Sequence, residues 1–257
     1  MGGLVGSLLF SWMIQWYHWY DAYWTISILT TLAFLLLLIT NIDETAVNKE
    51  SEKPSLSQIL MLLNYPLLWV LVICVLLYGM LELGFKTWLP TFNTEVFKLS
   101  ESQSVVFLSI HAGAIALGRF LLGYLQEKFS WLYIQVANLA FAFILTLAVL
   151  SLTSYPRQYV ILLAAIFSII GFFYGSIYPT ICSIMLSYLP KVRHSAMSGI
   201  IVIFVQLGIA LGVSTIGFLS KNFNIHNAFY VMLLPMGILP FLLIFYNKLC
   251  VTISKTH

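Results

Sequence analysis

The sequence predicts an all-α polytopic membrane protein with about eight transmembrane helices. Of its 257 residues, 61% are hydrophobic and only 8% are charged, whereas soluble domains carry about 25% charged residues. The hydrophobic residues occur in long unbroken runs, and a run of about 20 residues makes a helix that spans the hydrocarbon layer. A backbone in lipid must also satisfy its own hydrogen bonds, which favours helices in these runs.

Seven full-length runs and one shorter run give the expected helices. In chain order they cover residues 2–16 (the shorter run), 22–40, 66–89, 104–125, 132–152, 159–186, 196–219 and 228–249. The polar stretch 41–57 is expected to be a flexible linker, with a short interfacial helix near 56–63 after it. We therefore divide the chain into residues 1–40, 41–65, 66–249 and a tail, 250–257.

Basic residues are distributed unequally between the two sides of the membrane. If the linker 41–57 faces the cytoplasm, eight basic residues lie on that side and three on the other. Cytoplasmic loops of membrane proteins carry such an excess of Lys and Arg. The eight are Lys49, Lys53, Arg119, Lys128, Lys191, Arg193, Lys248 and Lys255, and the three are Lys98, Arg157 and Lys221. We expect a cytoplasmic C-terminus and a location in a bacterial inner (plasma) membrane.

Other classes of function find no support in the sequence. Cys74, Cys182 and Cys250 lie in or at the end of hydrophobic runs without C-x-x-C spacing, so we interpret them as small hydrophobic residues. The metalloprotease and Walker motifs are absent, and one mid-helix histidine, His111, does not suffice for haem ligation between two helices. We expect no enzyme activity, cofactor, metal or nucleic-acid partner; the expected partners are the lipid bilayer, a small solute and protons.

The beginning of the chain resembles its end at a constant offset of 206 residues. Gly2-Gly3-Leu4-Val5-Gly6 corresponds to Gly208–Gly212, Asp21-Ala22-Tyr23-Trp24 to Asn227-Ala228-Phe229-Tyr230, Leu36-Leu37 to Leu242-Leu243, and Asn41 to Asn247. A repeat of this length indicates two copies of one membrane unit. The second copy is complete and the first is mostly missing, so we expect residues 1–40 to be the remnant of an N-terminal half.

One segment resembles the signature loop of the major facilitator superfamily, in which a glycine is followed four residues later by an acid and then a base. The segment runs Gly118-Arg119-Phe120-Leu121-Leu122-Gly123-Tyr124-Leu125-Gln126-Glu127-Lys128. Gly123, Glu127 and Lys128 match, whereas Ser130, Trp131 and Leu132 replace the later glycine and basic pair. The resemblance implies a close helix approach at the glycine and an acid–base bridge between helix ends at the cytoplasmic face.

Two further segments resemble the sugar:proton symporter branch that includes fucose permeases. They are Trp88-Leu89-Pro90-Thr91-Phe92 and Leu108-Ser109-Ile110-His111-Ala112-Gly113, with His111 where that branch has tryptophan. The resemblance covers helices five to twelve of a twelve-helix fold of two six-helix halves. It implies that residues 66–249 are the complete C-terminal half, that helix five is cut, and that helices five and eleven line the interface between halves.

Glu82 and Lys86 are the strongest candidates for transport. They lie one helical turn apart in the run 66–89, with the acid first, which favours an ion pair. An ionisable residue at mid-membrane costs about 2.5–3.5 kcal/mol, so such a residue is a functional candidate. Glu82 would bind a solute hydroxyl or take up a proton. Lys86 would contribute to the same site or instead extend to the outer interface.

The remaining candidates are uncharged. His111 is expected at a depth similar to that of Glu82, where it would share a proton with Glu82, bind solute, or simply bond to a neighbouring helix carbonyl. Gln206 lies mid-helix and needs a partner. Tyr174 and Tyr178 flank Pro179, which frees a backbone carbonyl and kinks its helix, as in transporter sites.

Glycines four residues apart predict close helix crossings at three places. The pairs are Gly2 with Gly6, Gly171 with Gly175, and Gly208 with Gly212. The crossings would serve either static packing or sliding between the two halves.

The combined hypothesis is a secondary transporter of a small polar solute, a sugar with protons, that works by alternating access. The alternative is a non-transporting remnant, or one subunit of a transporter completed by a separately encoded N-terminal part. The DNA upstream would distinguish these, because four further helices require about 150–170 codons.

Overall fold

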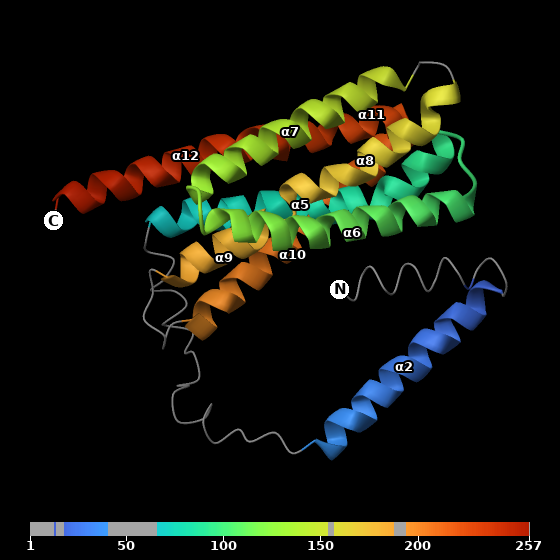
Figure 1. The fold of residues 1–257 in the computed structure, drawn as a ribbon, viewed down its shortest axis with the longest axis horizontal. Helices are drawn as coiled ribbons and strands as arrows, with labels where there is room; N and C mark the ends of the chain where they lie inside the picture. The colour runs from blue at the N-terminus through green and yellow to red at the C-terminus, as the bar shows by residue number, and fades with distance from the viewer. Residues whose placement is uncertain (1–12, 14–17, 41–65, 154–156, 188–193, 257) are drawn as a thin grey trace.

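The computed structural model describes residues 13, 18–40, 66–153, 157–187 and 194–256. Apart from residue 13, the expected run 2–16 lies outside these residues, as do the linker 41–57, the interfacial helix near 56–63, Gly2 and Gly6. Every element in the described part is a helix. Those from α5 onward form a bundle, and α2 lies apart from it (Figure 1).

From α5 onward, the helices follow one another with short connections. They are α2 (Trp19–Ile39), α5 (Pro66–Glu95), α6 (Glu101–Gln126), α7 (Trp131–Leu152), the 3-10 turn η1 (Arg157–Tyr159), α8 (Val160–Tyr174), α9 (Ile177–Ser187), α10 (His194–Phe223), α11 (Ile225–Phe229), the 3-10 turn η3 (Tyr230–Met232) and α12 (Leu233–Thr256). In the bundle, α5 packs mainly on α10, α6 on α8, and α7 on α8 and α12.

Three of the expected helices differ in the structure, and one of them, 228–249, begins at Ile225 and is divided into α11, η3 and α12. The run 66–89 was expected to end before Pro90, but α5 continues through Pro90 to Glu95. A proline removes one backbone donor and need not end a helix in which neighbouring helices hold the chain. The run 159–186 is divided into α8 and α9 by a break at Gly175–Ser176.

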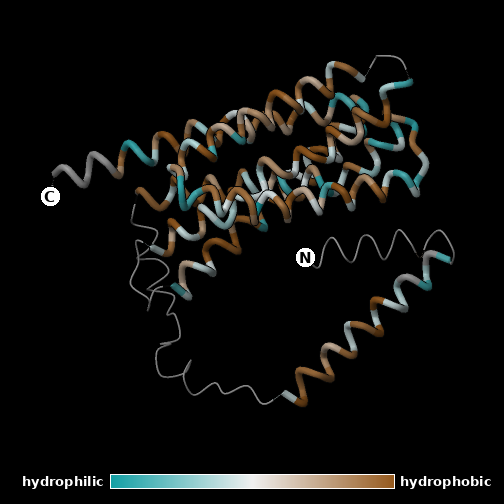
Figure 2. Tube along the Cα trace, in the orientation of Figure 1, coloured by the Kyte–Doolittle hydropathy of each residue, from teal (hydrophilic) through white to brown (hydrophobic). Residues whose placement is uncertain are grey.

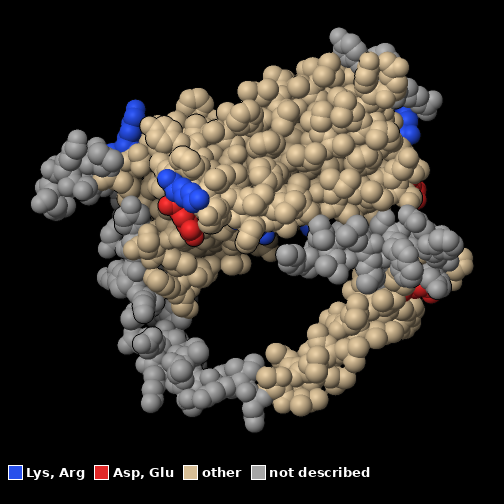
Figure 3. Space-filling view, viewed as in Figure 1, with Lys and Arg blue, Asp and Glu red and all other residues tan. Residues whose placement is uncertain are grey.

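Six helical stretches in the described residues are long and hydrophobic enough to cross a membrane. They belong to the bundle, and the hydrophobic part of α2, Tyr23–Ile39, is shorter. Hydrophobic residues occur along the length of every helix (Figure 2). The face of the bundle in Figure 3 shows few Lys, Arg, Asp or Glu side chains, most of them near its ends. The chain is thus a multi-pass membrane protein.

Glycines bring α5 and α10 into backbone contact. A Cβ atom on Gly208 would overlap the carbonyl oxygen of Leu76, and one on Gly212 would overlap that of Met80. On the other helix, a Cβ on Gly79 would overlap the Val205 carbonyl oxygen. The close helix crossing predicted at Gly208 and Gly212 is therefore present, and the helix they face is α5, inside the bundle.

The two copies of the repeat begin their helices in the same register. His18 is the N-cap of α2 and Asn224 is the N-cap of α11, two positions related by the offset of 206 residues. The backbone N–H of Asp21 bonds to the His18 carbonyl, and in the second copy Ala228 bonds to Asn224. The side chain of Asn224 also accepts from the Asn227 N–H. The two helices thus start at corresponding positions but differ in length, since α2 has 21 residues and α11 has 5.

Candidate functional site

An ion pair joins α5 and α6 next to the end of α8. Tyr78 and Glu82 lie one turn apart on α5, and Arg119 lies on the facing side of α6. Arg119 Nη2 donates to Glu82 Oε1 at 2.9 Å and to the Tyr78 hydroxyl at 3.2 Å. The Glu82 side chain is 15% exposed and that of Arg119 is 43% exposed. The pair is therefore half-buried and open on one side.

The ion pair corrects one expectation. The spacing of Glu82 and Lys86 predicted an ion pair within one helix, but Glu82 binds Arg119, and within the described residues Lys86 has no carboxylate within 4.0 Å. Arg119 lies in the helix predicted to contain it, and α6 continues beyond it to Gln126.

The break between α8 and α9 supplies the third partner of Arg119. Pro179 has no backbone N–H, so the carbonyl of Gly175, four residues earlier, lacks its usual helical donor. Arg119 Nε donates to this carbonyl oxygen at 3.2 Å. The freed carbonyl predicted from Pro179 is therefore present, and the guanidinium of a neighbouring helix satisfies it.

Glycines allow α6 and α8 to approach closely enough for this contact. A Cβ on Gly118 would overlap the Phe172 carbonyl oxygen, and one on Gly175 would lie 2.6 Å from that of Ile115. A Cβ on Gly171 would lie 3.0 Å from the carbonyl oxygen of His111. The spacing of Gly171 and Gly175 predicted such a crossing.

Aromatic rings form one wall beside the ion pair. Tyr178 stacks on Tyr78 with ring centroids 5.6 Å apart. Tyr78 is fully buried, whereas Tyr178 is partly exposed. Sequence reasoning missed Tyr78, although its position one turn before Glu82 on the same helix face would have suggested it. The site thus combines a cation, an anion and a half-open aromatic surface.

His111 belongs to a separate buried network. Its Nδ1 lies 2.8 Å from the Ser168 carbonyl oxygen, which can only accept, so Nδ1 donates. In the neutral ring Nε2 then accepts from the Tyr174 hydroxyl at 2.6 Å. The Phe85 ring stacks on His111 with centroids 5.1 Å apart, and His111 and Tyr174 are both 0% exposed. Of the three roles expected for His111, the structure shows the hydrogen bond to a neighbouring helix carbonyl. Its hydrogen-bond partners in the described residues do not include Glu82.

Tyr174→Phe is expected to destabilise the bundle by about 1–2 kcal/mol, because it leaves the buried Nε2 of His111 without a donor. Thermal unfolding of the purified protein in detergent micelles would measure this. The matched control is Tyr133→Phe on α7, whose side chain is 78% exposed and should change stability by less than about 0.5 kcal/mol. Equal effects of the two substitutions would contradict the network.

Several sequence candidates lie outside the site. Gln206 is exposed on α10 and makes no hydrogen bond within the described part of the chain. A Cβ on Gly123 would meet no described atom within 4 Å, so the close approach expected there is absent from the described bundle. Among the described residues Glu127 forms no ion pair, and the Lys128 ammonium lies 4.8 Å from the centre of the Tyr124 ring.

A polar cluster near the ends of α6 and α9 was not predicted. Gln135 Nε2 donates to the hydroxyls of Ser176 and Thr180 at 3.1 and 2.8 Å. The Thr180 hydroxyl bonds to Gln126 Oε1 at 2.8 Å. These bonds connect α9 to α6 and α7 just beyond the break, and nothing in the sequence marks four uncharged residues from three helices as neighbours.

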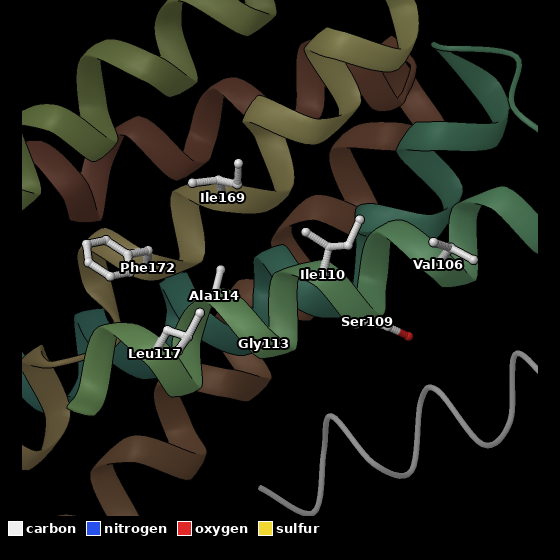
Figure 4. A pocket seen from close by; sticks show the side chains of 8 residues that line it. All are labelled: Val106, Ser109, Ile110, Gly113, Ala114, Leu117, Ile169 and Phe172. Carbon is white, nitrogen blue, oxygen red and sulfur yellow. The ribbon is translucent and has the colours of Figure 1, made fainter. Parts of the chain in front are cut away.

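The described cavities are hydrophobic and separate from the ion pair. One, of about 380 Å³, lies between α6 and α8 and is lined by Val106, Ser109, Ile110, Gly113, Ala114, Leu117, Ile169 and Phe172. The Ser109 hydroxyl points away from it (Figure 4). Another, of about 390 Å³, lies between α7 and α12. In the described residues no cluster of His, Cys, Asp and Glu side chains could hold a metal ion.

The family of the chain follows from comparison with known proteins. The family model of the Major Facilitator Superfamily matches residues 1–190 and, in a second overlapping match, residues 136–249. The chain belongs to the major facilitator superfamily. This agrees with the all-helical fold and with the register shared by α2 and α11. No curated protein matched the sequence.

A solved structure of the superfamily has the same fold. It is a bacterial homolog of the human lysosomal transporter Spinster, in an inward-facing and unoccupied conformation, with a TM-score of 0.65 and 15% sequence identity. The match covers 92% of this chain and 62% of that one, so the chain spans less than two thirds of the length of its structural relative.

Proposed function

We propose that this chain is part of a secondary transporter that moves a small polar solute together with protons by alternating access. The observation that carries the proposal is the Arg119–Glu82 ion pair, which lies between two membrane-spanning helices. Charges at this depth are costly and mark transport pathways and proton relays. Superfamily membership supports the same class of function.

The site suits a step in which Glu82 exchanges a proton. Its carboxylate has one cationic partner within 4.0 Å in the described structure, and the side chains of Glu82 and Arg119 are 15% and 43% exposed. The helix break at Gly175–Ser176 lies beside the pair, and such discontinuous helices are where secondary transporters hold substrates and coupling ions.

A sugar is the solute that the sequence resemblance favours, and the rings of Tyr78 and Tyr178 offer a surface on which a sugar could stack. His111, which occupies the place of a tryptophan in that branch, is 0% exposed and fully bonded. It is therefore not available to a solute. The site itself consequently favours polar solutes in general over sugars in particular.

Glu82→Gln is expected to reduce proton-linked uptake to background, because an amide does not take up a proton. Cells that express the wild-type protein or the variant would be given radiolabelled sugars, amino acids and carboxylates. Uptake of each solute and the internal pH of the cells would be recorded. Glu95→Gln is the matched control, since Glu95 ends the same helix and is exposed. Unchanged pH-dependent uptake by Glu82→Gln, with normal protein level in the membrane, would contradict the proposal.

A further inference from the structure

We propose that Arg119 is the binding group for an anionic solute, a small carboxylate, which replaces the Glu82 carboxylate when Glu82 takes up a proton. This inference rests on the proposed proton-linked function and names its solute class. It differs from the sugar expected from the sequence resemblance.

The first argument is charge balance at the ion pair. With Glu82 ionised, the pair is neutral, and Arg119 donates to it at 2.9 Å. A proton taken up by Glu82 would leave the guanidinium, which stays charged in proteins, without an anion in a membrane-spanning helix. An uncompensated charge in such a place is strongly unfavourable. A solute carboxylate at Arg119 restores neutrality, so proton uptake and anion binding favour each other.

The second argument is the unused face of the guanidinium. Arg119 has five N–H groups; its Nε bonds to Gly175, and Nη2 bonds to Tyr78 and Glu82. Its Nη1 group has no partner among the described residues, and the side chain is 43% exposed. A carboxylate can therefore bind Nη1 first and then occupy the position of the Glu82 carboxylate, in the two-point geometry that arginine prefers.

The third argument is that the remaining partners hold Arg119 in place during the exchange. The bond to the Gly175 carbonyl does not involve Glu82, and the Tyr78 hydroxyl contacts the guanidinium as well as Glu82. The guanidinium therefore keeps its position when Glu82 is protonated. The partly exposed ring of Tyr178, stacked on Tyr78, offers an apolar surface beside it for the solute's carbon atoms.

No other described charge takes the place of Arg119. Besides Glu82, the described titratable side chains on the packed elements are Cys74, Tyr78, Lys86 and Glu95 on α5, Glu101, His111, Arg119 and Tyr124 on α6, Tyr133 on α7, Tyr174 on α8, Tyr178 and Cys182 on α9, His194 and Lys221 on α10, His226 on α11, Tyr230 on η3, and Tyr246, Lys248 and Cys250 on α12. Of the cations among these, only Arg119 lies within 4.0 Å of the Glu82 carboxylate in the described part.

The test is calorimetric titration of the purified chain in lipid nanodiscs with sodium benzoate, benzamide and D-glucose. Benzamide has the shape of benzoate without its charge. Benzoate alone should bind, and its affinity should fall about tenfold per pH unit where Glu82 is ionised. Titrations in buffers of different ionisation enthalpy should show about one proton taken up per benzoate bound.

Three variants complete the experiment. Glu82→Gln should bind benzoate without proton uptake, and its affinity should not depend on pH. At mildly alkaline pH this variant should bind benzoate at least about tenfold more tightly than the wild type does, because the competing carboxylate is gone. Arg119→Gln should not bind benzoate. Glu95→Gln should behave as wild type, and circular dichroism would verify that each variant is folded.

Three results would overturn the inference. They are the absence of benzoate binding to folded wild-type protein, benzoate binding without proton uptake, and equal binding of benzamide or glucose. None of them decides the proposed function, which the uptake assay with Glu82→Gln tests separately. If uptake of a neutral solute is proton-linked and Glu82→Gln abolishes it, the transporter proposal stands and the anionic solute class is wrong.

Discussion

Gly208→Ala is expected to destabilise the bundle by about 2–3 kcal/mol, the upper part of the range for overpacking. The added methyl group would overlap the backbone carbonyl of Leu76, and a backbone atom cannot move aside as a flexible side chain can. The two helices must separate, which loses contacts along α5 and α10. Thermal unfolding in detergent micelles, together with the yield of folded protein, would measure the effect.

Gly199→Ala provides a control on the same helix. A Cβ at Gly199 would meet no atom within 4 Å in the described structure, and alanine is a better helix former than glycine by up to about 1 kcal/mol. This substitution should be neutral or stabilising. Similar losses from both substitutions would show that the close approach of α5 and α10 does not limit stability.

Arg119→Met is expected to cost about 1–3 kcal/mol, because it leaves the largely buried Glu82 carboxylate without its cation and the Gly175 carbonyl without its donor. Breaking a fully buried pair costs about 3–5 kcal/mol, and the smaller value allows for the 43% exposure of Arg119. The double variant Glu82→Gln, Arg119→Met should recover most of the loss, since it removes the unpaired charge.

A double-mutant cycle measures this coupling directly. Unfolding of wild type, the two single variants and the double variant would give the interaction free energy of Glu82 and Arg119. Lys128→Met is the control for loss of a cation, because Lys128 lies just after the end of α6 and its ammonium contacts the Tyr124 ring in the described structure. Additive effects of the two substitutions would mean that the ion pair contributes nothing to stability.

Most of the fold could be predicted from the sequence, because helix length and hydrophobicity are dictated by the bilayer. The runs 104–125 and 132–152 differ from α6 and α7 by a few residues at most. Where prediction failed, tertiary packing decided. Pro90 suggested a helix end but lies inside α5. Similarly, the spacing of Gly208 and Gly212 predicted a close crossing but not that α5 is the facing helix, since spacing alone does not indicate which helix a glycine faces.

The site was predicted in its residue types but not in its pairing. Glu82 was identified because a carboxylate in a hydrophobic run is rare, and Lys86 was chosen as its partner because it lies one turn away. Arg119, the actual partner, is distant in the sequence and belongs to a motif that suggested a loop. Local spacing indicates contacts within a helix, whereas contacts between helices depend on crossing geometry that the sequence does not state.

The backbone contact between α5 and α10 limits how the bundle can move. Because Gly84 packs directly on Gly212, a shift of either helix by one turn would bring larger side chains into a space that accommodates none. The two helices must therefore travel as one stiff unit that carries Glu82 with it. α9 is joined to α6 and α7 through side-chain hydrogen bonds, and it also packs Ile177, Ile181 and Met185 into the core. Two spectroscopic labels, one on α5 and one on α10, should therefore keep the same separation in every state of the protein.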